Sequence, residues 1–188
     1  RYGIPAYRLP REIIDQELQP IVDLGVELNL HTVVGKDISL AELREQNKAV
    51  FVGIGAHKGR LLGIPGEDAE GMWTGTSFLN AVNSGAEVDV GKRVLVIGGG
   101  DTAIDAARVS KRLIGDSAAM ASKLGAQVTI LYRRTRAEMP AIEREIDEAI
   151  EEDINIEYLA APIEILRDDE GAGCALVVPR LELGDPDA

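Results

Sequence analysis

The sequence contains one glycine-rich turn with the pattern of a phosphate-binding loop. The pattern is Gly98-x-Gly100-x-x-Ala103, and it directly follows a short apolar run at residues 93–97. In such a turn the first glycine permits a tight bend, the second lets a phosphate approach the backbone, and a small third residue keeps the next helix close to the sheet. Free backbone N–H groups and the positive end of the helix dipole then face the phosphates. The predicted nucleotide-binding turn consists of Gly98, Gly99, Gly100, Asp101, Thr102 and Ala103.

Asp101 and Thr102 lie in the first turn of the helix that this motif predicts. Their side chains could cap the helix, as short polar side chains commonly do, or they could also contact the bound nucleotide. The sequence leaves both interpretations open.

Three arginines follow the next β-rich run, residues 127–132. They are Arg133, Arg134 and Arg136, and no acidic residue intervenes before Glu138. NAD enzymes commonly place an acid at the end of this strand, whereas NADP enzymes place arginine there. The planar guanidinium fork suits phosphate oxygens. We therefore predict that these arginines bind the 2′-phosphate of NADPH; the alternative is a solvated cluster paired with the acidic helix that follows.

The glycine turn and the arginines are further apart in sequence than the about 20 residues usual for this motif. This separation predicts an insertion at residues 112–122, which lengthens the helix or adds a second one. No function is assigned to it.

Composition limits the classes of partner and compartment. The chain has 188 residues and a net charge of −12, which argues against general binding to nucleic acid or to anionic membranes. No apolar run approaches the about 20 residues of a membrane helix, and no signal peptide is visible. A single cysteine, Cys174, excludes an internal disulfide, a CxxC pair and a cluster ligand set within the chain. We expect a protein of the reducing cytoplasm.

The elements that must position these residues follow an α/β pattern. Strands are expected at 26–30, 49–52, 93–97, 127–132 and 154–159, with a closing hairpin of 163–167 and 175–183. Helices are expected at 11–25, 39–43, 77–82, 101–113 and from Pro140 onward. Ser39 and Glu42 form a capping-box pattern, and Pro20 should kink or divide the first helix.

The remaining polar residues favour structural interpretations. His31 and His57 lack companions at ligand spacing, so each is expected to be structural or exposed, and no metal site is predicted. Cys174 is expected to be a small buried filler. Acidic residues oppose the isoleucines 142, 146 and 150, which predicts a solvated face, with docking of a basic partner less favoured. They are Glu143, Glu145, Asp147, Glu148, Glu151, Glu152 and Asp153. No catalytic triad or carboxylate pair emerges, in agreement with chemistry carried by cofactors.

Several motifs occur in the same order in one known family. They are Arg1-Tyr2-Gly3-Ile4-Pro5 with Arg8-Leu9-Pro10, the Val-Gly-x-Asp segment 34–37, Gly53-Ile54-Gly55-Ala56, Gly98 to Ala103 with Ile104-Asp105, and Tyr132-Arg133-Arg134 with Met139-Pro140. Over nearly its whole length the chain resembles the small (β) subunit of NADPH-dependent glutamate synthase. Relatives of that subunit include the NADPH-binding half of dihydropyrimidine dehydrogenase and the larger subunit of NADH-dependent ferredoxin:NADP oxidoreductase.

The resemblance implies a Rossmann-like, three-layer FAD/NAD(P)-binding α/β fold in which the NADPH domain interrupts the FAD domain. It implies a flavoprotein in which NADPH gives a hydride to FAD and electrons pass to iron–sulfur clusters, with a large partner subunit. Residues 1–85 would be a partial FAD-domain segment and connector. Residues 86–188 would be the NADPH domain, incomplete at its C-terminal end.

The resemblance also assigns residues. Gly98, Gly100, Asp101, Thr102, Arg133 and Arg134 fall at NADPH positions. Segments that line FAD contain Arg1, Pro5, Val33, Gly53, Gly55 and Ala56. The family's opening cysteine-rich region, first FAD glycine motif and closing FAD segment have no counterpart here.

These departures lead us to expect an excised segment that binds FAD poorly or not at all and needs the parent protein for hydride transfer. The alternative is a nucleotide-binding or docking module without turnover of its own. A disulfide reductase of the same general architecture is disfavoured by the missing CxxC pair, unless that pair lies in the absent N-terminal part of the parent protein.

Overall fold

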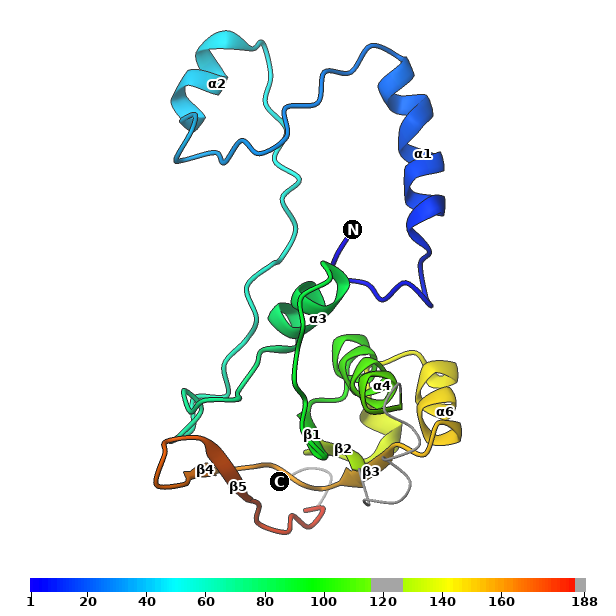
Figure 1. The fold of residues 1–188 in the computed structure, drawn as a ribbon, viewed down its shortest axis with the longest axis vertical. Coiled ribbons are helices and arrows are strands. Elements are labelled where there is room, and N and C mark those ends of the chain that lie inside the picture. The colour runs from blue at the N-terminus through cyan, green and yellow to red at the C-terminus, as the bar shows by residue number, and fades with distance from the viewer. Residues whose placement is uncertain (116–126, 185–188) are drawn as a thin grey trace. The chain divides into compact units, whose positions relative to one another are not determined.

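A computed structural model describes residues 1–115 and 127–184 of the chain (Figure 1). Contacts divide the chain into two compact units. Unit 1 comprises Arg1 and Leu9–His57, and unit 2 comprises Tyr2–Arg8 and Lys58–Ala188. Of the predicted insertion at 112–122, residues 112–115 continue a helix and the rest lies outside the described residues.

Unit 1 contains two helices, α1 (Arg11–Asp23) and α2 (Leu40–Gln46). Pro20 lies inside α1 without dividing it, and the chain leaves the helix at Gly25, whose φ of +92° favours glycine. The predicted capping box opens α2: the Ser39 amide donates to Glu42 at 2.8 Å, and the Glu42 amide donates to the Ser39 hydroxyl at 3.1 Å. The helix predictions for this unit are confirmed.

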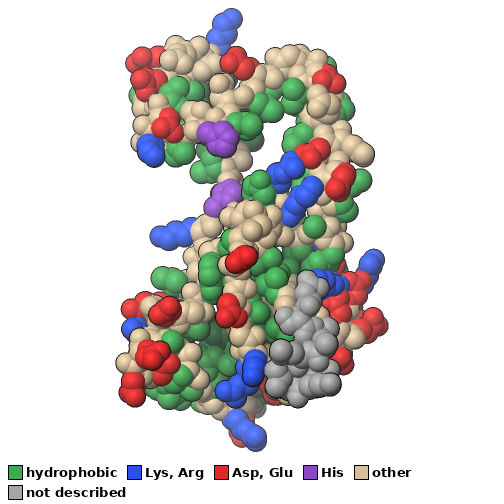
Figure 2. Space-filling view, in the orientation of Figure 1, with side chains coloured by type: hydrophobic (Ala, Val, Ile, Leu, Met, Phe, Trp, Pro, Cys, Tyr) green, Lys and Arg blue, Asp and Glu red, His purple; other side chains and the backbone are tan. Residues whose placement is uncertain are grey.

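The strands predicted at 26–30 and 49–52 are wrong. Both segments are coil, and their apolar side chains are exposed, with Phe51 at 94%. A strand is stable only when a neighbour pairs with its backbone groups, and neither segment has a partner strand among the described residues. Figure 2 shows apolar side chains at the surface of unit 1 as a result.

Unit 2 is built on a parallel sheet in the order β1-β2-β3. The strands are β1 (Arg93–Ile97), β2 (Gln127–Tyr132) and β3 (Asn155–Tyr158). Helix α4 (Asp101–Gly115) follows β1, and α6 (Glu143–Glu151) connects β2 to β3 after a short 3-10 turn, η1 (Arg136–Glu138). The predicted α/β class with a parallel sheet is confirmed.

A hairpin and one further helix complete unit 2. Strands β4 (Glu164–Arg167) and β5 (Gly173–Val177) pair antiparallel, as predicted, although the second strand ends before Leu183. Cys174 is exposed on β5, so its prediction as a buried filler is wrong: the hairpin leaves that position uncovered. No helix in the described ranges is long and apolar enough to cross a membrane.

Two apolar clusters hold unit 2 together. In the larger cluster, Ile104 and Ala107 of α4 pack with strand β2 and with Ile146 of α6. In the smaller cluster, helix α3 (Gly75–Asn83) packs Phe78 and Leu79 against α4. Helix α3 therefore belongs to the same compact unit as α4.

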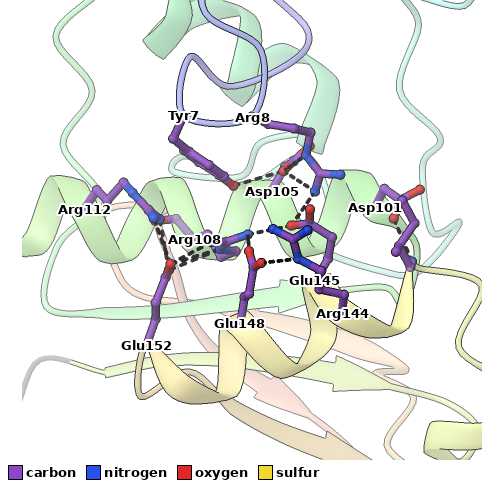
Figure 3. A network of polar contacts seen from close by, with 11 residues as sticks. Tyr7, Arg8, Asp101, Asp105, Arg108, Arg112, Arg144, Glu145, Glu148 and Glu152 are labelled. Atoms are coloured by element: carbon purple, nitrogen blue, oxygen red, sulfur yellow. Dashed lines mark hydrogen bonds and ion pairs between the residues drawn. The ribbon is translucent and has the colours of Figure 1, made fainter.

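Helices α4 and α6 are also joined by a buried cation, Arg108, which is 5% exposed (Figure 3). Its guanidinium contacts three carboxylates of α6 and its C-terminal end: Glu145 at 2.5 Å, Glu148 at 3.0 Å and Glu152 at 2.8 Å. Burial opposes the charge, but the hydrogen bond to Glu152 and the surrounding negative charges raise the pKa of Arg108 above its usual value. Arg108 therefore stays positively charged, and the three carboxylates that balance its charge link α6 to α4.

The N-terminal segment of unit 2 binds to the same network. Asp105 of α4 is buried and accepts hydrogen bonds from the Tyr7 hydroxyl at 3.0 Å and from Arg8 at 2.8 Å. The Tyr7 ring lies under the guanidinium groups of Arg108 and Arg112, at 4.7 and 4.1 Å. Burial and the Asp105 carboxylate raise the pKa of the Tyr7 hydroxyl, so it stays protonated and donates.

The prediction of a purely solvated acidic face on α6 is therefore wrong for part of that face. Glu145, Glu148 and Glu152 turn toward Arg108, whereas Ile142 and Ile150 are exposed. The periodicity predicted that the isoleucines face the core. Leaving the buried guanidinium of Arg108 without carboxylates would cost more free energy than leaving Ile142 and Ile150 exposed, so the carboxylates face inward instead.

Replacing Arg108 with alanine should destabilise the protein by about 1.5–3 kcal/mol, because three clustered carboxylates lose the cation they share and each keeps only one other arginine partner. Urea unfolding followed by circular dichroism would measure the change in unfolding free energy. Arg144→Ala is the control, since Arg144 is 82% exposed and makes one surface pair with Glu148; it should cost less than about 0.5 kcal/mol. Equal losses in the two variants would contradict the role of Arg108.

Stability should also depend on pH through Glu152. Burial tends to raise the pKa of Glu152, but hydrogen bonds from Arg108 and Arg112 outweigh it and leave the pKa lowered. A lowered folded-state pKa stabilises the fold above the unfolded value of about 4.3, and this stabilisation is lost as the pH falls through the folded value. Urea unfolding from about pH 6 down to about pH 3 should therefore show a falling free energy that Glu152→Gln flattens. Glu151→Gln, at an exposed neighbouring position, should keep the wild-type slope.

Candidate nucleotide-binding site

The glycine turn joins β1 to α4 as predicted. The Gly98 amide donates to the Leu131 carbonyl at 3.0 Å, which ties the turn to the end of β2. Gly98 has a φ of +140°, and a Cβ there would lie 3.3 Å from Cβ of Ala103. Backbone conformation thus requires glycine at position 98, and the small side chain of Ala103 allows the helix to start this close.

Gly99 is required for a different reason. A Cβ at this position would lie 2.5 Å from the ring of Tyr132, a contact that cannot form. The Gly99 carbonyl accepts a hydrogen bond from Ala141 at 3.1 Å, so the segment before α6 also rests on the turn. The sequence did not indicate that Tyr132 and Ala141 contact the turn; its only signal was an additional glycine between the two motif glycines.

Gly100 has no such internal reason to be glycine. Its φ lies outside the left-handed region, and the nearest atom to a Cβ there is Cγ of Pro140 at 3.9 Å, an ordinary contact. A glycine with open space beside its backbone allows an external group to come close. This matches the role of the second glycine in a pyrophosphate turn, so the turn fits a dinucleotide.

The start of α4 adds electrostatic attraction for an anion. The amides of Ala103 and Ile104 donate to the Gly100 carbonyl at 2.9 and 3.2 Å. The part of the chain that the structure describes supplies no acceptor for the amides of Asp101 and Thr102. Unpaired N–H groups at a helix start carry the positive end of its dipole.

The side chains of Asp101 and Thr102 contact neighbouring elements. The Asp101 carboxylate accepts from the amide of Ile142 at 3.0 Å, so it caps the approach to α6 (Figure 3). The methyl group of Thr102 faces Gly75 at the start of α3, where a Cβ would lie 3.0 Å from it. Both therefore position neighbouring helices at the turn.

The arginine loop, residues 133–138, begins where β2 ends. Arg133 and Arg134 are exposed, whereas Arg136 is ion-paired with Asp147 of α6. The pairing that was the alternative interpretation for the cluster thus applies to Arg136. Two cations of the loop stay accessible to an anion in solution.

The loop has a defined shape because a capping box closes it. The amide and hydroxyl of Thr135 donate to the Glu138 carboxylate at 3.0 and 3.2 Å. The backbone hydrogen bond from Thr135 holds the pKa of Glu138 below its ordinary value. The ionised Glu138 is therefore engaged within the loop.

The glycine turn and the arginine loop lie at one edge of the sheet. Strands β1 and β2 are parallel, and Ile97 is the register partner of Leu131, so the segments that follow them emerge side by side. This is the edge at which open parallel sheets bind ligands. The structure thus brings Gly98–Ala103 together with residues 133–136.

The residues implied for FAD are distributed over both units. Pro5 is buried in unit 2, where its carbonyl accepts from Arg8 in the turn that presents Tyr7. In unit 1, Arg1 is ion-paired with Asp15. Val33 begins a turn in which its own amide donates to the Asp37 carboxylate at 2.8 Å. Gly53, Gly55 and Ala56 lie in exposed coil.

Comparison with known proteins gives close relatives by sequence. The chain is 39% identical over 189 residues to the NADPH-Fe(3+) oxidoreductase subunit beta of Geobacter sulfurreducens, covering 99% of this chain and 27% of the relative. It is 34% identical over 199 residues to the glutamate synthase [NADPH] small chain of Escherichia coli, covering 100% of this chain and 40% of the relative. The chain thus spans less than half the length of these relatives.

The fold matches a solved structure and a family model. Mycobacterium tuberculosis FprA in complex with NADPH superposes with a TM-score of 0.74 at 20% identity, over 99% of this chain and 55% of that one. The model of pyridine nucleotide-disulphide oxidoreductases matches residues 12–172. The chain therefore belongs to the pyridine nucleotide-disulphide oxidoreductase family.

Proposed function

We propose that this chain carries the NADPH-binding site of a flavin-dependent oxidoreductase of the glutamate synthase small-subunit type. The observation that carries the proposal is that the open backbone at Gly100 and the exposed side chains of Arg133 and Arg134 lie at the same edge of the parallel sheet. The turn would hold the pyrophosphate, while Arg133 and Arg134 would hold the 2′-phosphate. Arg136 lies in the same loop and would contribute to the phosphate site only by exchanging its ion pair with Asp147 for the phosphate.

The charges around the turn support an anionic ligand. The Asp101 carboxylate would repel a pyrophosphate if it faced the turn, but its Oδ1 accepts the Ile142 amide, which holds the carboxylate toward the segment before α6. The open amides of Asp101 and Thr102 attract the phosphates. Gly99 and Ala103 keep the turn compact, so the positive end of α4 stays close to the strand ends.

In the whole protein, NADPH would supply a hydride that FAD accepts. Residues Arg1, Pro5, Val33, Gly53, Gly55 and Ala56 would lie in segments that line FAD. Electrons would pass on to iron–sulfur clusters, and a large partner subunit would carry the final acceptor. The relatives' names, which include NADPH and the glutamate synthase small chain, support this assignment.

A second candidate function is a nucleotide-binding or docking module without turnover of its own. It is favoured by the exposed coil in which Gly53, Gly55 and Ala56 lie, because the described residues of unit 1 do not wrap these glycines in a pocket. Calorimetric titration with NADPH and NADH separates nucleotide binding from docking alone. Binding to NADPH supports a cofactor site, and no binding to either nucleotide leaves only the docking module.

Replacing Arg133 and Arg134 together with alanine should weaken NADPH binding selectively. Hydrogen bonds to a charged group contribute about 1.5–3 kcal/mol, so the dissociation constant for NADPH should rise about 10- to 100-fold. NADH lacks the 2′-phosphate and should bind almost unchanged. Arg144→Ala, which removes an exposed arginine outside the loop, should alter neither affinity. An equal loss for both nucleotides would contradict the 2′-phosphate assignment.

The two neighbouring glycines should respond differently to alanine. Gly100→Ala places a methyl group in open space, so the melting temperature should hardly change, while NADPH and NADH should both bind at least about 10-fold more weakly. Gly99→Ala forces a methyl into the Tyr132 ring and should lower the melting temperature. Thermal unfolding and calorimetry together measure this contrast. Unchanged binding by Gly100→Ala would rule out a pyrophosphate at the turn.

A further inference from the structure

Tyr132 touches both phosphate-recognising segments of the proposed site. It is the last residue of β2, it is buried, and its ring occupies the space in which a Cβ of Gly99 would lie. The ring therefore sets how closely the glycine turn approaches the end of β2. The turn cannot move toward the strand without displacing this ring.

The hydroxyl of the same side chain holds the arginine loop. It donates to the backbone carbonyl of Glu138 at 2.6 Å, six residues further along the chain. The hydrogen bond closes residues 133–138 into a loop whose two ends meet at Tyr132. The Arg134 carbonyl is also held, by the Leu159 amide at 3.2 Å, so the hydroxyl fixes chiefly the far end of the loop.

We propose that Tyr132 is a positioning residue that sets the preference for NADPH over NADH. Its ring fixes the position of the pyrophosphate turn, and its hydroxyl fixes the loop that carries Arg133 and Arg134. The distance between the pyrophosphate site and the 2′-phosphate site is therefore set by one side chain. The proposal rests on the proposed function and deepens it. It assigns specificity to a residue that need not touch the nucleotide.

The geometry predicts a separable effect of the hydroxyl. Tyr132→Phe keeps the ring against Gly99 and removes only the bond to Glu138. The turn should keep its shape, so NADH affinity should change less than about twofold, well below the about fivefold change that corresponds to one hydrogen bond of about 1 kcal/mol. NADPH affinity should fall about fivefold, because the loop no longer holds both arginines at the 2′-phosphate.

The test is calorimetric titration of NADPH and NADH into wild type and variants, with melting temperatures measured in parallel. Tyr7→Phe is the matched control, since it removes another tyrosine hydroxyl hydrogen bond, to Asp105, away from the loop. Both variants should lose some stability. Only Tyr132→Phe should lower the ratio of NADPH to NADH affinity.

Glu138→Ala provides a second variant should Tyr132→Phe fold poorly. It removes the carboxylate that binds Thr135 and loosens the same loop without altering the ring or the turn, so it should lower the same ratio. An unchanged ratio in both variants, or an equal loss for both nucleotides, overturns the role of Tyr132. If wild type itself shows no preference, or if Arg133 and Arg134 prove dispensable, the 2′-phosphate proposal fails and this one fails with it.

Discussion

The assembly of unit 2 depends on the buried guanidinium of Arg108, whose positive charge must be balanced by carboxylates. Arg108 can lie between α4 and α6 only if carboxylates surround it, and Glu145, Glu148 and Glu152 supply them. These contacts fix α6 against α4, so the chain entering α6 must cross the start of α4. The bonds from Ala141 to Gly99 and from Ile142 to Asp101 follow from that crossing. The ion-pair network thus supports, from outside the proposed nucleotide site, the segment that hydrogen-bonds to the glycine turn.

Three consecutive glycines in the turn serve three different purposes. Gly98 adopts a conformation that other residues avoid, Gly99 makes room for an aromatic ring, and Gly100 leaves its backbone open. A motif records only that small residues recur, whereas the structure separates the reasons. Of the three glycines, only Gly100 has open space beside its backbone that indicates a ligand.

Local patterns predicted what local forces determine. The strand, turn and helix around Gly98, the capping box at Ser39 and the strand before Arg133 were correct because their signals lie within a few neighbouring residues. The strands at 26–30 and 49–52 were wrong because pairing depends on a partner elsewhere in the chain. The role of Arg108 was missed for the same reason, since its carboxylates come from a helix about 40 residues further along. The Tyr132 contact likewise joins segments that only the parallel sheet brings together.

The way Tyr7 and Arg8 join α4 bears on how the chain folds. The bond from Tyr7 to Asp105 spans 98 residues and encloses nearly all of unit 1. The entropic cost of closing a loop grows only with the logarithm of its length, about 0.6 kcal/mol per doubling. Removing residues 9–57 would roughly halve the span, so carrying that segment adds only about this much to closure. An interrupted domain of this kind is thermodynamically inexpensive. Its cost is kinetic, because Tyr7 and Arg8 are synthesised before α4 and must wait for that helix before they can dock.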